Sequence, residues 1–189
     1  MEVNGKIVII VAPSGTGKST LISRLKDEFS SLHESVSYTT RKRRPQEVHG
    51  VHYFFINKDE FLIKKDRDEF LEWALVHQDY KGTSKEFVES KIIEGKNLLF
   101  DLDVQGADSF KKHFGNRAEV IFIEPPSLEE LEVRLRSRNT ESDEVILLRL
   151  ENAGKELLRK NDYDYCIKND DLEKAFSDLK NTVKEILGG

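Results

Sequence analysis

One segment restricts the fold of this chain more than any other: a glycine-rich loop between an apolar run and an amphipathic stretch. The apolar run, Ile7–Val11, is short and rich in β-branched residues, which is typical of a buried parallel strand. After the loop, Leu21, Leu25 and Phe29 recur at helical spacing. The loop has Walker A spacing and reads Ala12-Pro13-Ser14-Gly15-Thr16-Gly17-Lys18-Ser19. This order of strand, loop and helix predicts an α/β protein with the P-loop NTPase fold.

The residues of the loop suit a bound phosphate chain. Gly15 and Gly17 lack a Cβ atom, so that backbone N–H groups can converge on an anion. The N-terminus of the following helix adds partial positive charge. Lys18 can reach β- and γ-phosphates, and the Ser19 hydroxyl can bind Mg²⁺. Ala12 holds the position of the first glycine of the pattern. The loop predicts a nucleotide but does not identify the phosphoryl acceptor.

Composition and charge narrow the range of partners. The chain has 189 residues, of which 38% are hydrophobic, and this fits one globular domain. Its net charge of −5 disfavours a nucleic-acid partner. Basic residues gather locally instead, at Arg41–Arg44 and Arg134–Arg138. Local basic clusters in an acidic protein indicate a small anionic ligand in a cleft.

The cysteine content and the lengths of the apolar runs bear on location. Cys166 is the single cysteine, so no disulfide can form within the chain, and we expect a cytoplasmic protein. Because Cys166 stands between Tyr165 and Ile167, we expect it to be buried as a small hydrophobic residue. No apolar run approaches the roughly 20 residues of a membrane span. Neither a membrane nor an obligate protein partner is predicted.

Apolar runs alternate with amphipathic stretches along the rest of the chain. We expect three further core strands, at Asn97–Leu102, Glu119–Ile123 and Tyr163–Ile167. We expect helices at Gly106–His113, from Ser127 onward, around Ile146–Leu157 and at Asp171–Leu187. This alternation implies right-handed crossovers and a parallel core sheet flanked by helices on both faces.

Residues 34–84 follow a different pattern, which we interpret as an inserted, mostly antiparallel lobe. Its expected strands are Glu34–Tyr38, Val51–Ile56 and Phe70–Val76. A helix should begin after Asn57, with Glu60 completing a capping box. A similar pattern at Thr83-Ser84-Lys85-Glu86 should open a helix that ends at Gly95. The predicted division is a core of residues 1–33, 85–126 and 153–189, a lobe of residues 34–84 and a helical lid of residues 127–152.

The remaining motifs resemble those of the guanylate kinase family over nearly the whole chain. They are, in order, Ser37-Tyr38-Thr39-Thr40-Arg41 with Arg44, Glu47, Gly50 and Tyr53; Phe70-Leu71-Glu72-Trp73-Ala74; Asp101-Leu102-Asp103-Val104-Gln105-Gly106; Arg134, Arg138 and Arg149; and Asn169-Asp170-Asp171-Leu172. The resemblance implies an enzyme of purine metabolism that transfers the γ-phosphoryl group of ATP to GMP, and to dGMP, with Mg²⁺ as cofactor.

The resemblance also implies which residues bind ATP and metal. The expected ATP-binding residues are Pro13, Ser14, Gly15, Thr16, Gly17, Lys18, Ser19, Thr20, Arg134 and Asn169, the last as an adenine contact. Mg²⁺ is expected at Ser19 and Asp101, directly or through water. The expected catalytic residues are Lys18, Arg41, Arg138 and Arg149, with the arginines of the lid closing over the phosphates to exclude water. A phosphate acceptor is already ionised, so catalysis should rest on alignment and charge neutralisation.

The same resemblance implies a GMP site. Its expected residues are Ser37, Arg41, Arg44, Tyr53, Glu72, Lys81, Thr83 and Asp101. Two guanidinium groups and a phenol suit a phosphate dianion. Guanine presents N1–H and an amine side by side, and Glu72 would accept both hydrogen bonds while Ser37 and Thr83 donate towards O6. Adenine lacks both donors and would leave this carboxylate unpaired. Asp101 and Asp103 end an apolar strand, where α/β folds place functional groups, and how the two divide their roles is left open.

Three positions depart from the pattern of the family. Lys81 replaces the second tyrosine before the glycine, Gln46 stands where glycine is usual, and Asn139 replaces a lid glycine. Our hypothesis is that the Lys81 ammonium contacts the acceptor phosphate. Two other functions remain open: a non-catalytic binding module of the same fold, and a kinase for another phosphorylated acceptor such as a ribose bisphosphate. The retained Gly17, Lys18 and Ser19 of the phosphate loop argue against the first, and Glu72 argues against the second.

Overall fold

A five-stranded parallel sheet forms the centre of the computed structural model, which describes residues 5–76, 78–137 and 142–188. The strand order is β2-β7-β1-β8-β9, and all neighbouring strands are parallel. The strands are β1 (Ile7–Val11), β2 (Leu32–Glu34), β7 (Asn97–Leu102), β8 (Ala118–Glu124) and β9 (Tyr165–Lys168). All five residues of β1 are buried, because this central strand is covered on both faces.

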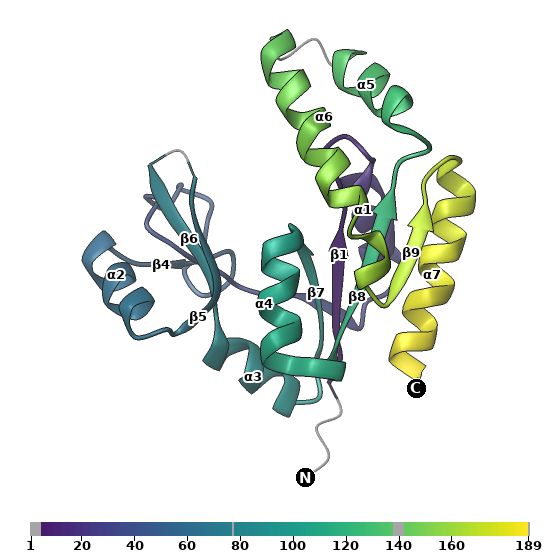
Figure 1. Ribbon diagram of the computed structural model, residues 1–189. Helices are drawn as coiled ribbons and strands as arrows, with labels where there is room; N and C mark the ends of the chain where they lie inside the picture. Colours follow the sequence, from purple (N-terminus) through teal and green to yellow (C-terminus); the bar gives the residue numbers. More distant parts are fainter. Residues whose placement is uncertain (1–4, 77, 138–141, 189) are drawn as a thin grey trace.

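Helices cover both faces of the core sheet (Figure 1). On one face, α1 (Lys18–Glu28) and α7 (Leu172–Gly188) pack against Val8 and Ile10. On the other, α3 (Lys85–Ile93) and α4 (Val104–Phe114) pack against Ile7 and Ile9. Successive residues of β1 thus enter opposite layers, as the period of a strand requires. The predicted parallel α/β core is confirmed.

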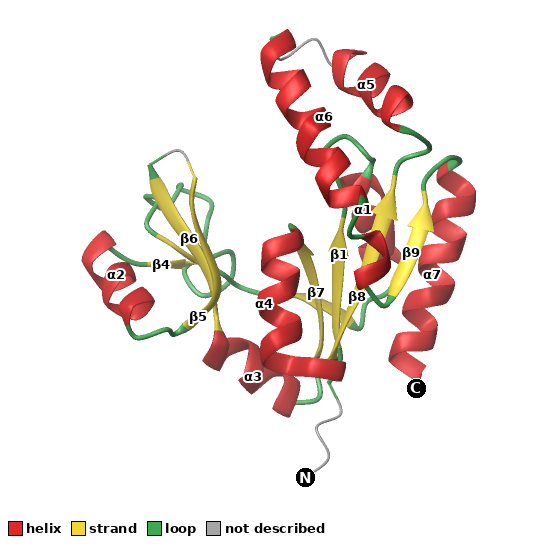
Figure 2. Ribbon diagram, viewed as in Figure 1, coloured by secondary structure: helices red, strands yellow, loops and turns green. Residues whose placement is uncertain are grey.

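A second sheet stands beside the core and is called the lobe sheet below (Figure 2). Its strand order is β4-β3-β6-β5. The strands are β3 (Tyr38–Thr39), β4 (Phe54–Phe55), β5 (Phe70–Val76) and β6 (Asp79–Ser84), and α2 (Lys58–Asp66) lies at this sheet. The β3–β6 and β5–β6 pairs are antiparallel and the β3–β4 pair is parallel. Asn57 and Glu60 form the expected capping box of α2.

Two further helices rise beyond the carboxyl end of the core sheet (Figure 1). They are α5 (Leu128–Ser137) and α6 (Asp143–Leu157), and they pack through Leu131, Leu135, Ile146 and Ala153. Short 3-10 turns, Gly115–Arg117 and Lys160–Asp162, precede β8 and β9. No helix in the described ranges is both long and apolar enough to cross a membrane.

The chain passes between the two sheets at two short connections. Glu34–Tyr38, predicted as one strand, is divided: Leu32–Glu34 pairs with β7 in the core, and Tyr38–Thr39 begins the lobe sheet. Residues 35–37 make the crossing. The return is shorter still, because Ser84 is both the last residue of β6 and the N-cap of α3, accepting a hydrogen bond from the Phe87 N–H. The prediction that Thr83 begins this helical cap was therefore wrong.

Several other boundaries also differ from the predictions. β6 was not predicted, and β4 covers only two residues of the expected Val51–Ile56 strand. The helix expected from Gly106 begins at Val104, because the Asp103 carboxylate accepts a hydrogen bond from the Gly106 N–H at 2.7 Å. Cys166 is exposed rather than buried, since β9 is an edge strand in which Tyr165 and Ile167 face the core and Cys166 points to the other side.

Candidate active site

The phosphate loop lies at the carboxyl end of β1 and has a constrained backbone. Gly15 and Gly17 have φ values of 94° and 95°, in the left-handed region that favours glycine. A Cβ atom on Gly15 would come within 2.9 Å of Leu135 on α5. Thr16 is fully buried and its hydroxyl donates to the Pro13 carbonyl at 2.7 Å. Both glycines are thus required by the shape of the loop.

Asn169, in the loop after β9, supports the phosphate loop through a hydrogen bond to its backbone. Its side chain donates from Nδ2 to the Thr16 carbonyl at 2.7 Å, and only 5% of the residue is exposed. A Cβ atom on Gly17 would lie 2.7 Å from this nitrogen. The amide is therefore turned to the loop backbone, and the adenine contact stays a prediction.

The lysine of the loop meets the end of the neighbouring strand. Lys18 Nζ lies 2.5 Å from Asp101 Oδ1 and donates to the Leu102 carbonyl at 3.0 Å. Ser19 and Thr20 are exposed in the first turn of α1. The two aspartates at the carboxyl end of β7 differ in role: Asp101, in the strand, binds the lysine, whereas Asp103, just after it, caps α4.

A cavity of about 660 Å³ lies between the lobe sheet and the carboxyl end of β7. We call it the acceptor pocket. It brings together six residues of the predicted acceptor set: Ser37, Tyr53, Glu72, Lys81, Thr83 and Asp101. The two predicted arginines, Arg41 and Arg44, are not part of its lining.

One end of the pocket carries a shielded carboxylate. The register of β5 and β6 sets Glu72 opposite Thr83, and the Thr83 hydroxyl donates to Glu72 Oε1 at 2.6 Å. The Ser37 hydroxyl is 3.4 Å from that of Thr83. Burial raises the pKa of Glu72 above its ordinary value; the Thr83 hydrogen bond opposes this shift, and the Asp103 charge adds to it. A half-buried carboxylate beside two hydroxyls suits a ligand edge with adjacent N–H donors and a carbonyl.

At the other end of the pocket two cations lie near the Tyr53 ring, and of these Lys81 lines the pocket whereas Arg41 does not. Arg41 Cζ lies 5.7 Å and Lys81 Nζ 5.6 Å from the centre of the Tyr53 ring. Arg41 also binds both carboxylate oxygens of Glu47, at 2.6 and 3.1 Å, and Glu47 accepts from the Arg44 N–H at 2.8 Å. These bonds, the Arg41 side chain first, lower the pKa of Glu47 to about 2. Glu47 is therefore a candidate for positioning Arg41, whereas the sequence showed it only as one residue of a family motif.

Helix α6 reaches the phosphate loop from above. Arg149 Nη1 donates to the Ser14 hydroxyl at 2.6 Å. Arg134 instead binds Glu130 on its own helix, at 3.3 Å. Arg138 and Asn139, named from the sequence, lie outside the described residues. Of the two predicted lid arginines that the structure describes, Arg149 contacts the loop and Arg134 pairs within its own helix.

Glu156 is a half-buried carboxylate that the sequence reasoning missed. It follows Arg149 by seven residues on α6 and so shares its helix face. Burial raises its pKa, the Lys18 charge lowers it and the Asp103 charge raises it. Glu156 therefore lies within electrostatic range of the loop lysine. Its spacing from Arg149 was the one signal in the sequence.

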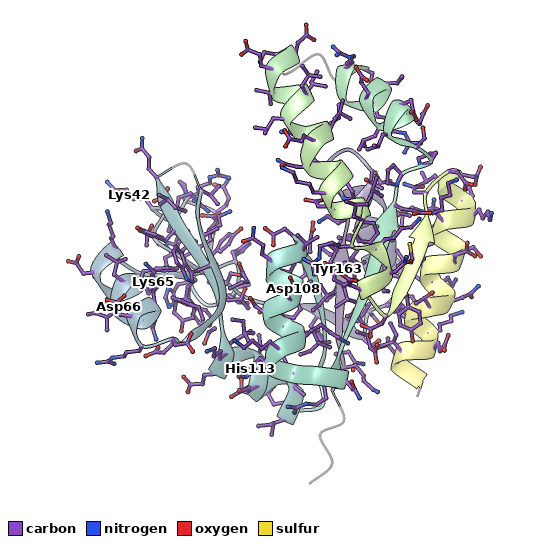
Figure 3. All side chains as sticks on the ribbon, viewed as in Figure 1. Lys42, Lys65, Asp66, Asp108, His113 and Tyr163 are labelled. Atoms are coloured by element: carbon purple, nitrogen blue, oxygen red, sulfur yellow. The ribbon has the colours of Figure 1, made fainter. Side chains whose placement is uncertain are left out.

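The end of the same helix is tied to α4. Arg159 binds both oxygens of Asp108, at 2.8 and 2.9 Å, and lies 5.6 Å from the Tyr163 ring centre. Asp108 and Tyr163 are labelled in Figure 3, between α4 and the end of α6. These contacts fix the base of the helix that carries Arg149 and Glu156.

The lysine of the phosphate loop contacts the end of β7, the strand beside β1, and a separate sheet carries the acceptor pocket. Together these features define a P-loop nucleotide phosphotransferase. A sequence model of the guanylate kinase family matches residues 4–186. The chain belongs to this family.

Individual relatives agree with the family match. The curated guanylate kinase of Aromatoleum aromaticum is 47% identical over 180 residues, which cover 95% of this chain and 88% of that protein. The guanylate kinase of Bacteroides thetaiotaomicron is 44% identical over 187 residues, or 98% and 92% of the two chains. The crystal structure of guanylate kinase from Anaplasma phagocytophilum has a TM-score of 0.68 and 30% identity, covering 98% of this chain and 87% of that one. The predicted fold and family are confirmed.

Proposed function

We propose that this chain transfers the γ-phosphoryl group of ATP to GMP, and to dGMP, giving ADP and GDP. The observation that carries the proposal is the buried Glu72–Thr83 pair, which shares one pocket with Asp101, the partner of Lys18. A carboxylate placed to bind a base indicates that the acceptor is a nucleotide. The loop lysine indicates that the phosphoryl donor is a nucleotide as well. Relatives named guanylate kinases support the same reaction.

The acceptor would bind with its base at Glu72. The ionised carboxylate accepts hydrogen bonds from guanine N1–H and the exocyclic amine, while the Ser37 hydroxyl lies beside Thr83 for O6. Thr83 donates its one hydroxyl proton to Glu72, so it would donate to O6 only by giving up that bond. Adenine offers neither donor on that edge, so its binding would leave the half-buried carboxylate with the Thr83 hydrogen bond alone. The 2′ position takes no part in this contact, which is why dGMP should also react.

The donor would bind along the phosphate loop. Backbone N–H groups of Gly15–Lys18 and the N-terminus of α1 face the phosphates. Lys18 would exchange Asp101 for the β- and γ-phosphates. Ser19 and Asp101 offer hydroxyl and carboxylate oxygens, the ligand type that Mg²⁺ prefers, and Mg²⁺ needs few protein ligands beside phosphates and water. When bound, Mg²⁺ neutralises charge on the donor phosphates.

Closure of three parts would align the two substrates. We propose the division into a core (1–33, 85–126, 153–189), a lobe (34–84) and a lid (127–152). Arg41 would neutralise the acceptor phosphate, and Arg149, with Arg138, the transferred group. Closure excludes water, which would otherwise compete as the acceptor. A cytoplasmic location, expected from the single cysteine, stays a prediction.

A coupled ADP-release assay tests the reaction. ATP and Mg²⁺ are offered with GMP, dGMP, AMP, UMP, CMP or a ribose bisphosphate, and the Lys18→Met variant controls for a contaminating kinase. Turnover with GMP and dGMP alone, lost in the variant, supports the proposal. Binding of GMP without turnover would instead favour the binding module, and turnover with the ribose bisphosphate would favour a different kinase.

A further inference from the structure

A second cavity, of about 390 Å³, lies along the outer edge of the lobe sheet. We call it the side pocket. Its lining includes Lys65 of α2, labelled in Figure 3, residues 70–74 of β5, and Asp103, Gln105 and Ser109 at α4. Because β5 is the last strand of its sheet, its outer edge faces α4 across this cavity.

The side pocket adjoins the acceptor pocket at the carboxylate proposed to bind guanine. Glu72, Ala74 and Asp103 line both cavities. The pKa of Glu72, raised first by burial, is raised further by the Asp103 charge, so these two carboxylates are close to each other. Glu72 therefore stands where the two cavities meet, between the edge of β5 and the start of α4.

The exocyclic amine of guanine would lie at this junction. The amine carries two hydrogens, and in the proposed complex Glu72 accepts one of them together with N1–H. A substituent in place of the other hydrogen leaves both hydrogen bonds to Glu72 intact. Because the amine lies beside Glu72, such a substituent would extend out of the acceptor pocket and into the side pocket.

We propose that the side pocket admits groups attached to this amine, so that the chain also phosphorylates guanosine monophosphates substituted on N2 with a small alkyl or aryl group. The inference rests on the proposed function and widens its substrate class. The transfer itself is the same. The bond between the γ-phosphorus and its bridging oxygen in ATP breaks, an oxygen of the acceptor phosphate forms the new bond, and the products are ADP and the N2-substituted GDP.

The walls of the side pocket suit an aryl group. Phe70 and Leu71 are buried and Trp73 is 44% exposed, so β5 offers an apolar wall on which a ring can pack. Gln105 and Ser109 form a polar wall on α4. The volume of the cavity lies within the roughly 300–1,000 Å³ typical of ligand sites, which leaves room for a benzyl group.

The test compares acceptors that differ at one atom of the base. Turnover with ATP and Mg²⁺ is measured for GMP, N2-methyl-GMP, N2-benzyl-GMP and N1-methyl-GMP, and calorimetric titration without ATP gives their affinities independently of turnover. Ser109→Phe fills the side pocket, because Ser109 lines it and does not line the acceptor pocket. Ser90→Phe is the matched control. Both hydroxyls donate to a carbonyl of their own helix, but Ser90 lines neither cavity.

We expect the wild type to use N2-methyl-GMP and N2-benzyl-GMP with kcat/KM within about tenfold of that for GMP, since the bonds to Glu72 are kept. N1-methyl-GMP, which lacks the N1–H donor, should be rejected. Ser109→Phe should lower kcat/KM for N2-benzyl-GMP at least about tenfold relative to that for GMP, because the two rings compete for one space. Ser90→Phe should keep the wild-type ratio. Thermal unfolding establishes that each variant is folded.

Three results would overturn the inference. They are a wild type that uses GMP but neither binds nor phosphorylates N2-benzyl-GMP, an unchanged ratio in Ser109→Phe, and acceptance of N1-methyl-GMP as readily as GMP. The proposed reaction fails separately, when GMP binds but is not phosphorylated. The ratio of the two calorimetric affinities in wild type and Ser109→Phe then decides whether the side pocket holds the substituent. A wild type that binds no GMP would remove both proposals.

Discussion

Replacing Glu72 by glutamine should change guanine recognition and folding stability in opposite directions. The carboxylate is mostly buried, its pKa is raised by burial, and it accepts a 2.6 Å hydrogen bond from Thr83. In the proposed complex it also accepts two N–H bonds from guanine. Glutamine has nearly the same shape but one acceptor, and its amide would face a guanine donor.

The expected loss of activity follows from these bonds. A hydrogen bond to a charged group contributes about 1.5–3 kcal/mol. Losing one of the two and adding a donor–donor conflict should cost about 2–4 kcal/mol, or about 30- to 1,000-fold in kcat/KM for GMP. The KM for ATP should stay near its wild-type value, because Glu72 is remote from the phosphate loop in the proposed complex.

The effect on stability has the opposite sign. Because the folded-state pKa of Glu72 lies above the unfolded value, the folded state binds more protons between the two values. Wild-type stability therefore falls as pH rises through this window, and the penalty persists above it. Glutamine carries no such penalty, so Glu72→Gln should be at least as stable as wild type at neutral pH. Below the unfolded pKa, the gain disappears.

Steady-state kinetics with GMP and thermal unfolding at several pH values measure both effects. Glu86→Gln, which removes an exposed carboxylate outside the pocket, is the control. A variant with unchanged kcat/KM for GMP would refute the base-reading role. A variant less stable than wild type at neutral pH would refute the electrostatic reasoning.

Three further substitutions test other contacts. Glu47→Gln should lower the melting temperature at neutral pH, with the difference vanishing as pH falls from about 4.5 to about 2, because Arg41 depresses the pKa of Glu47 in the folded state alone; a pH-independent difference would contradict this. Asn169→Ala should cost about 1–3 kcal/mol in urea unfolding, because it leaves a buried loop carbonyl unpaired, and an unchanged free energy of unfolding would refute the bracing role. Glu156→Gln should lower kcat about tenfold without loss of stability, as expected of a group that acts through the loop lysine; a wild-type kcat would remove Glu156 from the site.

Two further variants distinguish a specific role of Glu156 from general damage to its helix. Glu151→Gln removes a solvent-exposed carboxylate from the same helix as Glu156, where it pairs with Lys155, and should leave kcat unchanged. Glu156→Asp keeps the charge and should retain more activity than Glu156→Gln. Equal losses in all three would indicate general damage to the helix rather than a role at Lys18.

The sequence predicted correctly those strands, caps and loops whose residue pattern lies within the element itself. β1, β5 and β7 have the predicted boundaries, because each contains a mainly apolar stretch of its own. That stretch is buried in β1 and β7, whereas residues 73–76 of β5 are exposed. The capping box of α2 was likewise readable within four residues. The phosphate loop came from the same kind of local evidence.

Elements that depend on distant partners were not predictable in this way. β6 is polar and has Gly82 near its centre, where a Cβ atom would come within 3.1 Å of Phe61 and Phe70. Its extended form depends on pairing with β3 and β5. Cys166 looked buried because its neighbours are apolar, but only the strand order makes β9 an edge.

The same distinction between local patterns and distant contacts applies to the residues of the candidate site. Motifs supplied residues close in sequence, whereas contacts across the fold supplied their arrangement. The Lys18–Asp101 pair and the Asn169 bond to Thr16 join segments far apart in the chain. Glu156 was missed because an isolated glutamate on a charged helix carries no pattern of its own.

If the proposed closure takes place, the two short crossings between the sheets would act as its hinges. The hinges would be residues 35–37 and Ser84, so Ser37 and Thr83 would lie at or next to the axis of the movement. Points near an axis travel little when an arm swings, and points farther out travel more. The guanine base would thus be held almost stationary while Lys81 and Arg41 carry the phosphate through the longer arc towards the donor.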